Sequence, residues 1–218
     1  MSGNITLHCT GSLSQIALPA GSVTQGALAA GAVGRQQMEQ TALAEFNLPL
    51  ESWRVHDSGA ALSTTAAADD LGISAGSFGT AANSLQTIDF KASSVTAYAR
   101  RVVELPLSYD AGQTLEILLS GAMNTTIADG YCWLDVEAHK IAASGSVGAD
   151  ICTTAGSSAD TSINSLTSSD HSFTINASGL TAGSLIDIRV TVTGTDTATG
   201  TATIGEITRA KLRCDCRG

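Results

Sequence analysis

One serine in the chain sits in a motif with the spacing of a hydrolase nucleophile. Residues 72–76 read Gly-Ile-Ser-Ala-Gly, which fits G-x-S-x-G with Ser74 at the centre. In that motif a buried strand precedes the serine and a helix follows it, so that a strained turn exposes the hydroxyl. Neither the run before Ser74, Ala66–Asp70, nor the Ser-Phe-Gly after the motif has that character. We therefore predict no catalytic residue, no cofactor-binding residue and no enzyme.

Carboxylates and a histidine offer a second kind of chemistry, the binding of a metal ion. Asp135, Glu137 and His139 alternate along one predicted strand, so they share a face at a spacing that suits metal ligation. The alternative, which we favour, is a polar outer face of a sheet. Calcium sites usually take their ligands from loops, which makes Asp69 and Asp70 better candidates. These two remain weak candidates, and the sequence does not predict a metal site.

The remaining titratable and thiol pairs have simpler interpretations. His56–Asp57 and Asp170–His171 are adjacent in sequence without an accompanying serine or cysteine constellation, which favours polar loop residues. Cys214 and Cys216 lack the two-residue gap and the second pair of a zinc site. The five cysteines form an odd, scattered set, so we expect reduced thiols rather than a disulfide framework.

The charge balance and the N-terminus limit the partners and the compartment. The chain has 218 residues with 11 Lys and Arg against 20 Asp and Glu, a net charge of −9. This acidity disfavours nucleic acid as a partner. Residues 1–4 lack the basic start of a secretory signal, and no apolar run approaches the ~18 residues of a membrane span. We expect synthesis in the host cytoplasm and no membrane partner.

Three cations near the C-terminus are a local exception to the acidic charge. Arg209, Lys211 and Arg213 alternate on one face of the last predicted strand. They could pair with an acidic partner surface or protect an edge strand from aggregation. We favour the second interpretation, because lysine and arginine are common on edge strands.

The first 48 residues form an arm that is rich in alanine and glycine and has a five-residue apolar period. Neither a helix nor a strand would gather residues at this spacing on one side, so we expect them to contact symmetry mates or a host surface. The alternative is a linker in which the period arose by chance. Within the arm, residues 35–46 contain no Gly or Pro and are predicted to form a short helix. The predicted contact residues are Leu13, Leu18, Val23, Leu28, Val33, Met38, Leu43 and Leu48.

Residues 49–218 carry strand patterns separated by turn residues, which predict an all-β fold of two packed antiparallel sheets. Even-numbered residues of 132–138 and 186–192 are apolar and are expected to face inward. Threonine occupies every odd position from 191 to 203, which predicts a solvated face across a turn. The predicted strands are Ser52–His56, Leu85–Phe90, Val95–Leu105, Thr114–Met123, Tyr131–Ile141, His171–Asn176, Leu185–Thr193 and Thr201–Arg213.

Two parts of the sequence resemble phage virion proteins. The run Gly21–Gly34 is similar to the repeated segments of tail fibres and of head-attached fibre or decoration proteins, which are commonly trimeric. The body, with Asp69–Gly72, Gly76–Gly79 and Leu105–Gly112, resembles the jelly-roll modules of virion proteins. The resemblance implies a structural virion protein with a jelly-roll-like β-sandwich. It would assemble as a homotrimer and attach through the arm to the major capsid protein or another virion protein.

A second class of function is a binding module. The irregular segments Gly59–Ser84 and Gly145–Ser169 are long for a plain sandwich, and long loops often bind ligands. A tail-fibre or head-fibre module of this kind would recognise a glycan on the host surface. The chain offers only two Trp and three Tyr for stacking on sugars, which makes this alternative weaker.

Overall fold

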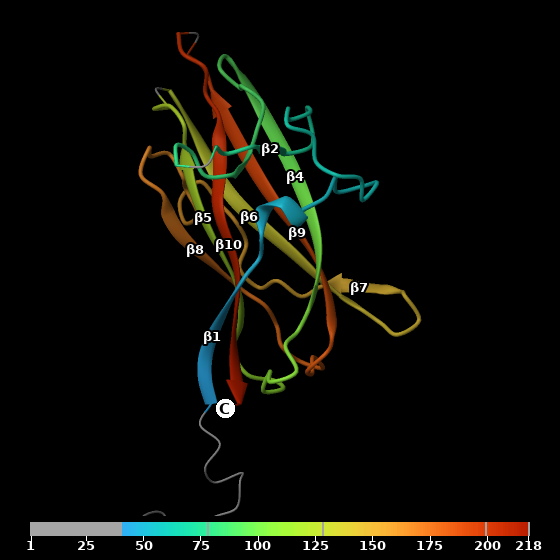
Figure 1. Cartoon of the computed structure of the whole chain (residues 1–218). Helices are drawn as coiled ribbons and strands as arrows, with labels where there is room; N and C mark the ends of the chain where they lie inside the picture. Colours follow the sequence, from blue (N-terminus) through green and yellow to red (C-terminus); the bar gives the residue numbers. More distant parts are fainter. Residues whose placement is uncertain (1–40, 78, 128, 199, 218) are drawn as a thin grey trace, which may run out of the picture. The chain divides into compact units, whose positions relative to one another are not determined.

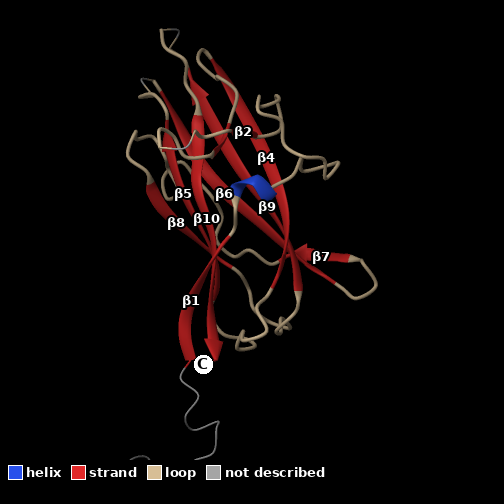
Figure 2. Cartoon of the chain, in the orientation of Figure 1, coloured by secondary structure: helices blue, strands red, loops and turns tan. Residues whose placement is uncertain are grey.

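The computed structural model describes residues 41–77, 79–127, 129–198 and 200–217, which lie in a compact unit that begins at Gln40. Within these residues the chain forms two antiparallel sheets packed face to face, and its helical structure is a single 3₁₀ turn, η2 (Leu50–Ser52) (Figures 1 and 2). The described residues include no helix with the length and apolar character needed to cross a membrane.

The strand order of the described sheets defines the fold. One sheet runs β2-β3-β10-β5-β8, with β1 also paired to β10, and the other runs β4-β9-β6-β7. Numbered along the chain from β3, the first sheet holds the first, eighth, third and sixth strands, and the second sheet holds the second, seventh, fourth and fifth. This is the jelly-roll order, built from two Greek keys. The predicted all-β jelly-roll-like sandwich is confirmed.

The described strands have the following bounds. In the first sheet they are β1 (Thr41–Asn47), β2 (Gly72–Ser74), β3 (Ser84–Gln86), β5 (Leu115–Met123), β8 (Ser169–Thr174) and β10 (Gly205–Arg217). In the second sheet they are β4 (Ser93–Glu104), β6 (Gly130–Ile141), β7 (Val147–Asp150) and β9 (Leu185–Asp196).

Alternation of side chains along the strands builds the core between the sheets. In β6, Leu134 and Val136 are buried while Asp135 and Glu137 remain partly exposed on the other face. The apolar residues of β9 at 186, 188, 190 and 192 are fully buried in the same way. Both inward-facing sets predicted from the sequence are therefore confirmed. The polar residues between them form the outer face of the β4-β9-β6-β7 sheet.

The short helix predicted for residues 35–46 is wrong for Thr41–Phe46, which form most of β1. Along β10, β3 pairs only with Glu206 and Ile207, so the rest of that side of β10 is open to another strand. β1 occupies it, with Phe46 opposite Leu212. Backbone pairing with an open strand outweighs the local helical pattern. Residues 35–40 lie outside the described residues.

The interpretation of the C-terminal cations as protection for an edge strand is also wrong. β10 lies inside its sheet, between β5 on one side and β3 and β1 on the other. Its cations pair with carboxylates of this same chain on neighbouring strands. The pairs are Arg209–Asp170 at 3.0 Å, Lys211–Glu45 at 2.5 Å and Arg213–Glu116 at 3.1 Å.

The run of alternate threonines is solvated only in part. Thr191 and Thr203 are buried, whereas Thr197 and Thr201 are exposed. The Thr203 hydroxyl donates to Oδ2 of the buried Asp196 at 2.6 Å, and the Ala198 amide donates to Oδ1 at 2.9 Å. One carboxylate therefore holds both sides of the β9–β10 turn.

Glycine at position 194 is required by the packing of a buried ring. A Cβ added to Gly194 would lie 2.5 Å from Cζ of Phe90, which is fully buried. We expect Gly194→Ala to lower the free energy of unfolding by about 1–3 kcal/mol, the usual cost of overpacking, as measured by urea denaturation. Gly200→Ala is the matched control, because nothing lies within 4 Å of its added Cβ. Equal stabilities of the two variants would contradict this packing.

The Asp196 carboxylate makes the stability of the fold dependent on acid pH. Its hydrogen bond from Thr203, followed by that from the Ala198 amide, holds the pKa of Asp196 below its ordinary value of 3.8. Its contribution to the free energy of unfolding is complete above that value and is lost as the pH falls through the lower pKa of the folded state. We expect Asp196→Asn to lose less stability than the wild type between about pH 5 and about pH 2, as measured by urea denaturation. A pH profile for Asp196→Asn identical to that of the wild type would exclude this role.

Candidate functional site

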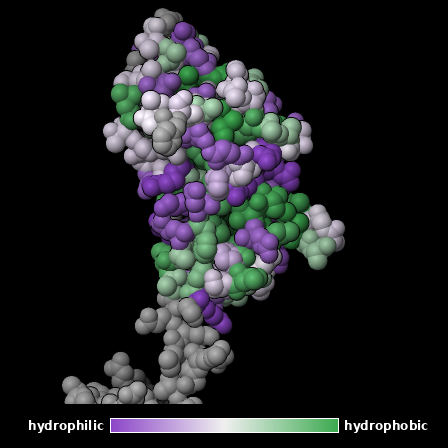
Figure 3. Space-filling model, viewed as in Figure 1, coloured by the Kyte–Doolittle hydropathy of each residue, from purple (hydrophilic) through white to green (hydrophobic). Residues whose placement is uncertain are grey.

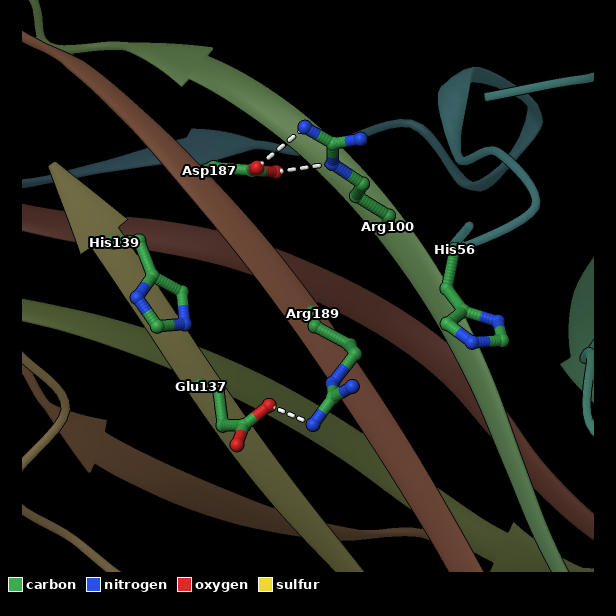
Figure 4. A pocket seen from close by; sticks show the side chains of 6 residues that line it. All are labelled: His56, Arg100, Glu137, His139, Asp187 and Arg189. Carbon is green, nitrogen blue, oxygen red and sulfur yellow. Dashed lines mark hydrogen bonds and ion pairs between the residues drawn. The ribbon is translucent and has the colours of Figure 1, made fainter. Parts of the chain in front are cut away.

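Three neighbouring strands place charged side chains together on the outer face of the β4-β9-β6-β7 sheet. In the pairing register, Arg189 of β9 lies opposite both Arg100 of β4 and Glu137 of β6, and Asp187 lies opposite His139. A depression of about 320 Å³ lies here. Figure 4 shows the six residues that line it, of which one comes from the loop after η2: His56, Arg100, Glu137, His139, Asp187 and Arg189.

The first of two ion pairs in the depression joins β4 and β9. Nε and Nη2 of Arg100 donate to the two carboxylate oxygens of Asp187 at 2.6 and 2.5 Å (Figure 4). The Asp187 side chain is 11% exposed and that of Arg100 is 37% exposed. This bidentate bond raises the pKa of Arg100 above its ordinary value. Such a fork fixes the orientation of both groups.

The second ion pair rests on an aromatic side chain. Arg189 donates through Nη2 to Glu137 of β6, and its Cζ lies 4.8 Å from the centre of the Tyr98 ring. The His56 ring lies against the same tyrosine, with centroids 4.7 Å apart and the rings tilted by 44°. Nδ1 of His56 is in turn bonded to Oδ1 of Asp70 at 2.9 Å. The loop after η2 is thereby attached to the sheet face.

The depression is lined by polar side chains that are already paired with other groups. Each of its charged groups already has a partner in this chain, so a ligand would meet donors and acceptors that are held in position. His139 uses Nδ1 for the carbonyl of Gly148 at 3.0 Å, and Nε2 has no bond to the described residues. The guanidinium groups of Arg100 and Arg189 supply donors, and the carboxylates of Asp187 and Glu137 supply acceptors.

The sequence correctly predicted that Asp135, Glu137 and His139 share an outer strand face. They point to separate partners, however: Asp135 accepts from the Gly156 amide at 2.7 Å, Glu137 pairs with Arg189, and His139 bonds to Gly148. Asp70, one of the two weak calcium candidates, bonds to His56. Within the described residues, no three His, Cys, Asp or Glu side chains are grouped so that they could hold a metal ion.

The serine of the G-x-S-x-G string lies in a different context from a nucleophile elbow. Ser74 ends the short strand β2, where it pairs with Ser84 of β3. Of the described residues that follow, Ala75 and Gly76 have no regular structure, Ser77 forms an isolated bridge with Ala81, and residues 79–80 form a turn. The adjacent His56–Asp57 pair is not a functional unit either, because His56 bonds to Asp70 instead. Asp170 pairs with Arg209, on the outer face of the other sheet.

Two of the eight predicted arm contacts fall within the described residues. Leu48 is 3% exposed and packs in the core of the sandwich, so its burial requires no partner chain. Leu43 of β1 is 55% exposed. The other predicted contacts lie outside the described residues, namely Leu13, Leu18, Val23, Leu28, Val33 and Met38.

The described cysteines carry free thiols, as expected. Cys132, Cys152, Cys214 and Cys216 form no disulfide. Burial raises the pKa of Cys132 to about 12 and that of Cys152 to about 11. A thiol with so high a pKa is a poor nucleophile. These residues therefore contribute to packing rather than to chemistry.

No sequence motif marked four members of the site. They are His56, as the partner of Asp70, and the sheet residues Tyr98, Arg100 and Asp187. The available signal was the alternation of charged and β-branched residues in Leu185–Thr193, which marked Asp187 and Arg189 as outward-facing. What the sequence could not supply was the register that brings β4 and β6 to either side of β9.

The comparisons with known proteins show similarities of structure alone. No protein-family model and no curated protein matches the chain. The xylan-binding domain CBM22-1 of Paenibacillus barcinonensis Xyn10C is similar over 81% of this chain and 95% of that one, at 11% identity and a TM-score of 0.39. The mannan-recognising module TmCBM27 is similar over 80% of this chain and 98% of that one, at 14% identity and a TM-score of 0.37.

A viral structure is similar at the same level. Infectious bursal disease virus, Gx strain, matches over 82% of this chain and 32% of that one, at 14% identity and a TM-score of 0.37. All of these TM-scores are low. The assignment of the jelly-roll fold therefore rests on the strand order of this chain.

Proposed function

We propose that this chain is a glycan-binding module that holds its ligand on the outer face of the β4-β9-β6-β7 sheet. The observation that carries the proposal is the set of paired charged side chains around the 320 Å³ depression, with the Tyr98 ring beneath Arg189. A sugar presents several hydroxyl groups, each able to donate and to accept a hydrogen bond. A surface with fixed donors and acceptors in alternation matches that chemistry.

The apolar part of a sugar would also find a surface here. At the start of β9, Leu185 lies between Glu104 of β4 and Ile141 of β6, and Ile141 pairs in turn with Val147 of β7. Leu185 is 40% exposed and Val147 is 52% exposed. Figure 3 shows a continuous hydrophobic area beside the β6–β7 hairpin, next to hydrophilic side chains. Polar and apolar groups side by side are typical of sites for ligands that have both kinds of surface.

Binding without turnover is part of this proposal. The Ser74 motif lies outside the depression, and the carboxylates that line it are engaged with arginines. A general acid or base needs a proton that it can exchange with the substrate, and a carboxylate held by a guanidinium is poorly suited to that task. We therefore propose that the ligand is bound and released unchanged.

Removal of the guanidinium of Arg189 tests the glycan site. We expect Arg189→Ala to weaken binding of the full chain to its best ligand on a glycan array by about tenfold or more, because a charge-assisted hydrogen bond and its aromatic support are lost. Arg209→Ala is the matched control, since Arg209 forms a similar exposed ion pair on the other sheet. Equal binding by both variants, or no glycan bound by the wild type, would refute the proposal.

A second candidate function is that of a structural virion protein, anchored by the arm and assembled as a homotrimer. The apolar residue at every fifth position from Leu13 to Met38 favours it, since neither a helix nor a strand would gather residues at this spacing on one side. The two functions are compatible. An anchored trimer would present three glycan-binding faces, and multivalency would strengthen weak individual contacts.

Charged substitutions within the period test the assembly. We expect the full chain to sediment as a trimer and the double variant Leu18→Asp, Leu28→Asp to sediment as a monomer, because a carboxylate cannot be buried in an apolar contact. The control Ser14→Asp, Thr24→Asp adds the same charge to the same segment, between the periodic positions, and should remain trimeric. A monomeric wild type would contradict the proposed trimer.

A further inference from the structure

A second depression adjoins the first. It has a volume of about 380 Å³ and shares Arg100 with the depression described above. Two further arginines lie in it, Arg54 after η2 and Arg101 on β4. The described residues that line it include no Asp or Glu; they are Ser52, Arg54, Gly59, Arg100, Arg101 and Val102.

The two additional arginines differ from most cations of this acidic chain. Seven of the ten lysines and arginines in the described residues pair with a carboxylate. Arg54 and Arg101 instead donate to backbone carbonyls. Nη1 of Arg54 donates to the carbonyls of Glu51 and Trp53 at 3.1 and 3.0 Å, and Nη1 of Arg101 donates to that of Pro49 at 3.1 Å. Both guanidinium groups are thus attached to the η2 turn.

These bonds leave most of each guanidinium available. Nε and Nη2 of Arg54 and of Arg101 make no hydrogen bond to the described residues, and neither atom of either residue is a buried, unsatisfied group. The two positive charges also act on each other: burial and then the charge of Arg54 lower the pKa of Arg101. An anion placed between them would relieve this repulsion and accept several charge-assisted bonds.

We propose that this second depression binds the anionic group of an acidic saccharide, namely a carboxylate, sulfate or phosphate carried by a sugar. The inference rests on the glycan-binding function proposed above and specifies its ligand class. Arg100 belongs to both depressions, so one oligosaccharide can lie across them with its hydroxyl groups over Arg189 and its anionic group between Arg54 and Arg101. Val102, 47% exposed, lines the path beside Arg100.

Calorimetric titration of the full chain tests this with matched ligands. The probes are trigalacturonate, its uncharged methyl ester, a heparin-derived tetrasaccharide and inorganic phosphate. We expect at least one acidic saccharide to bind about tenfold or more tightly than the ester, because bonds to an ionised acceptor are stronger than those to a neutral one. The preference should decline as salt is added.

The variant Arg54→Gln, Arg101→Gln should abolish the preference for the acidic saccharide and leave binding of the ester unchanged. Because Arg101 is partly buried, the single variant Arg54→Gln, at an exposed position, provides a second test and should reduce the preference. Arg209→Gln is the control and should retain it. A preference for the acidic saccharide that survives in both variants would overturn the inference. So would a chain that binds phosphate through these arginines but binds none of the saccharides.

The same titrations separate this inference from the function on which it rests. If the ester binds in a manner that depends on Arg189 but no acidic saccharide is preferred, the glycan-binding function stands and the anionic site is refuted. If neither the ester nor any acidic saccharide binds, both are refuted.

Discussion

Strand β10 pairs with β5 along most of its length, with β3 near its start and with β1 at its end, so it joins three segments that lie far apart in the sequence. These strands can share one sheet only if the side chains of β10 alternate consistently. Ile207, Ala210, Leu212 and Cys214 are buried on its inner side, and the cations occupy the other. The register with β5 shifts between Ile207 and Arg209, so that one residue of β10 is extra. This bulge keeps the buried residues on the inner side both before and after it.

Two ion pairs on opposite outer faces of the sandwich differ in burial. Pairs such as Arg209–Asp170 are about half exposed, and ion pairs of that kind contribute roughly 0–1 kcal/mol to stability. In the Arg100–Asp187 pair the carboxylate is nearly buried and both of its oxygens are engaged. The value of this pair lies in geometry, since it fixes a guanidinium at the junction of two depressions. A flexible surface arginine would lose conformational entropy on binding a ligand, and this one has already lost it.

Much of the sandwich could be predicted from local alternation, and the reasons for the failures are physical. The inward sets of β6 and β9 were visible because each strand has one apolar and one polar face. The helix prediction for residues 41–46 failed because helical spacing and strand alternation coexist in that segment. Pairing with the open side of β10 decides between the two structures. The candidate site was recognisable in part from Glu137 and His139. Its completion by His56, Tyr98 and Arg100 depends on long-range register and on a loop that crosses to β4, neither of which leaves a mark in a single sequence.

The pairing of β1 with the end of β10 has a consequence for the order of events during synthesis. Thr41 lies opposite Arg217, so the first described strand meets its partner only after the residues of β10 have been synthesised. Until then the apolar faces of β5 and β9 lack part of their cover. Contacts between such distant segments also carry a large loop-closure entropy, which slows folding. A nascent chain of this topology stays partly exposed until β10 has been made. The low content of aromatic residues, 4%, reduces the apolar surface that is then open to aggregation.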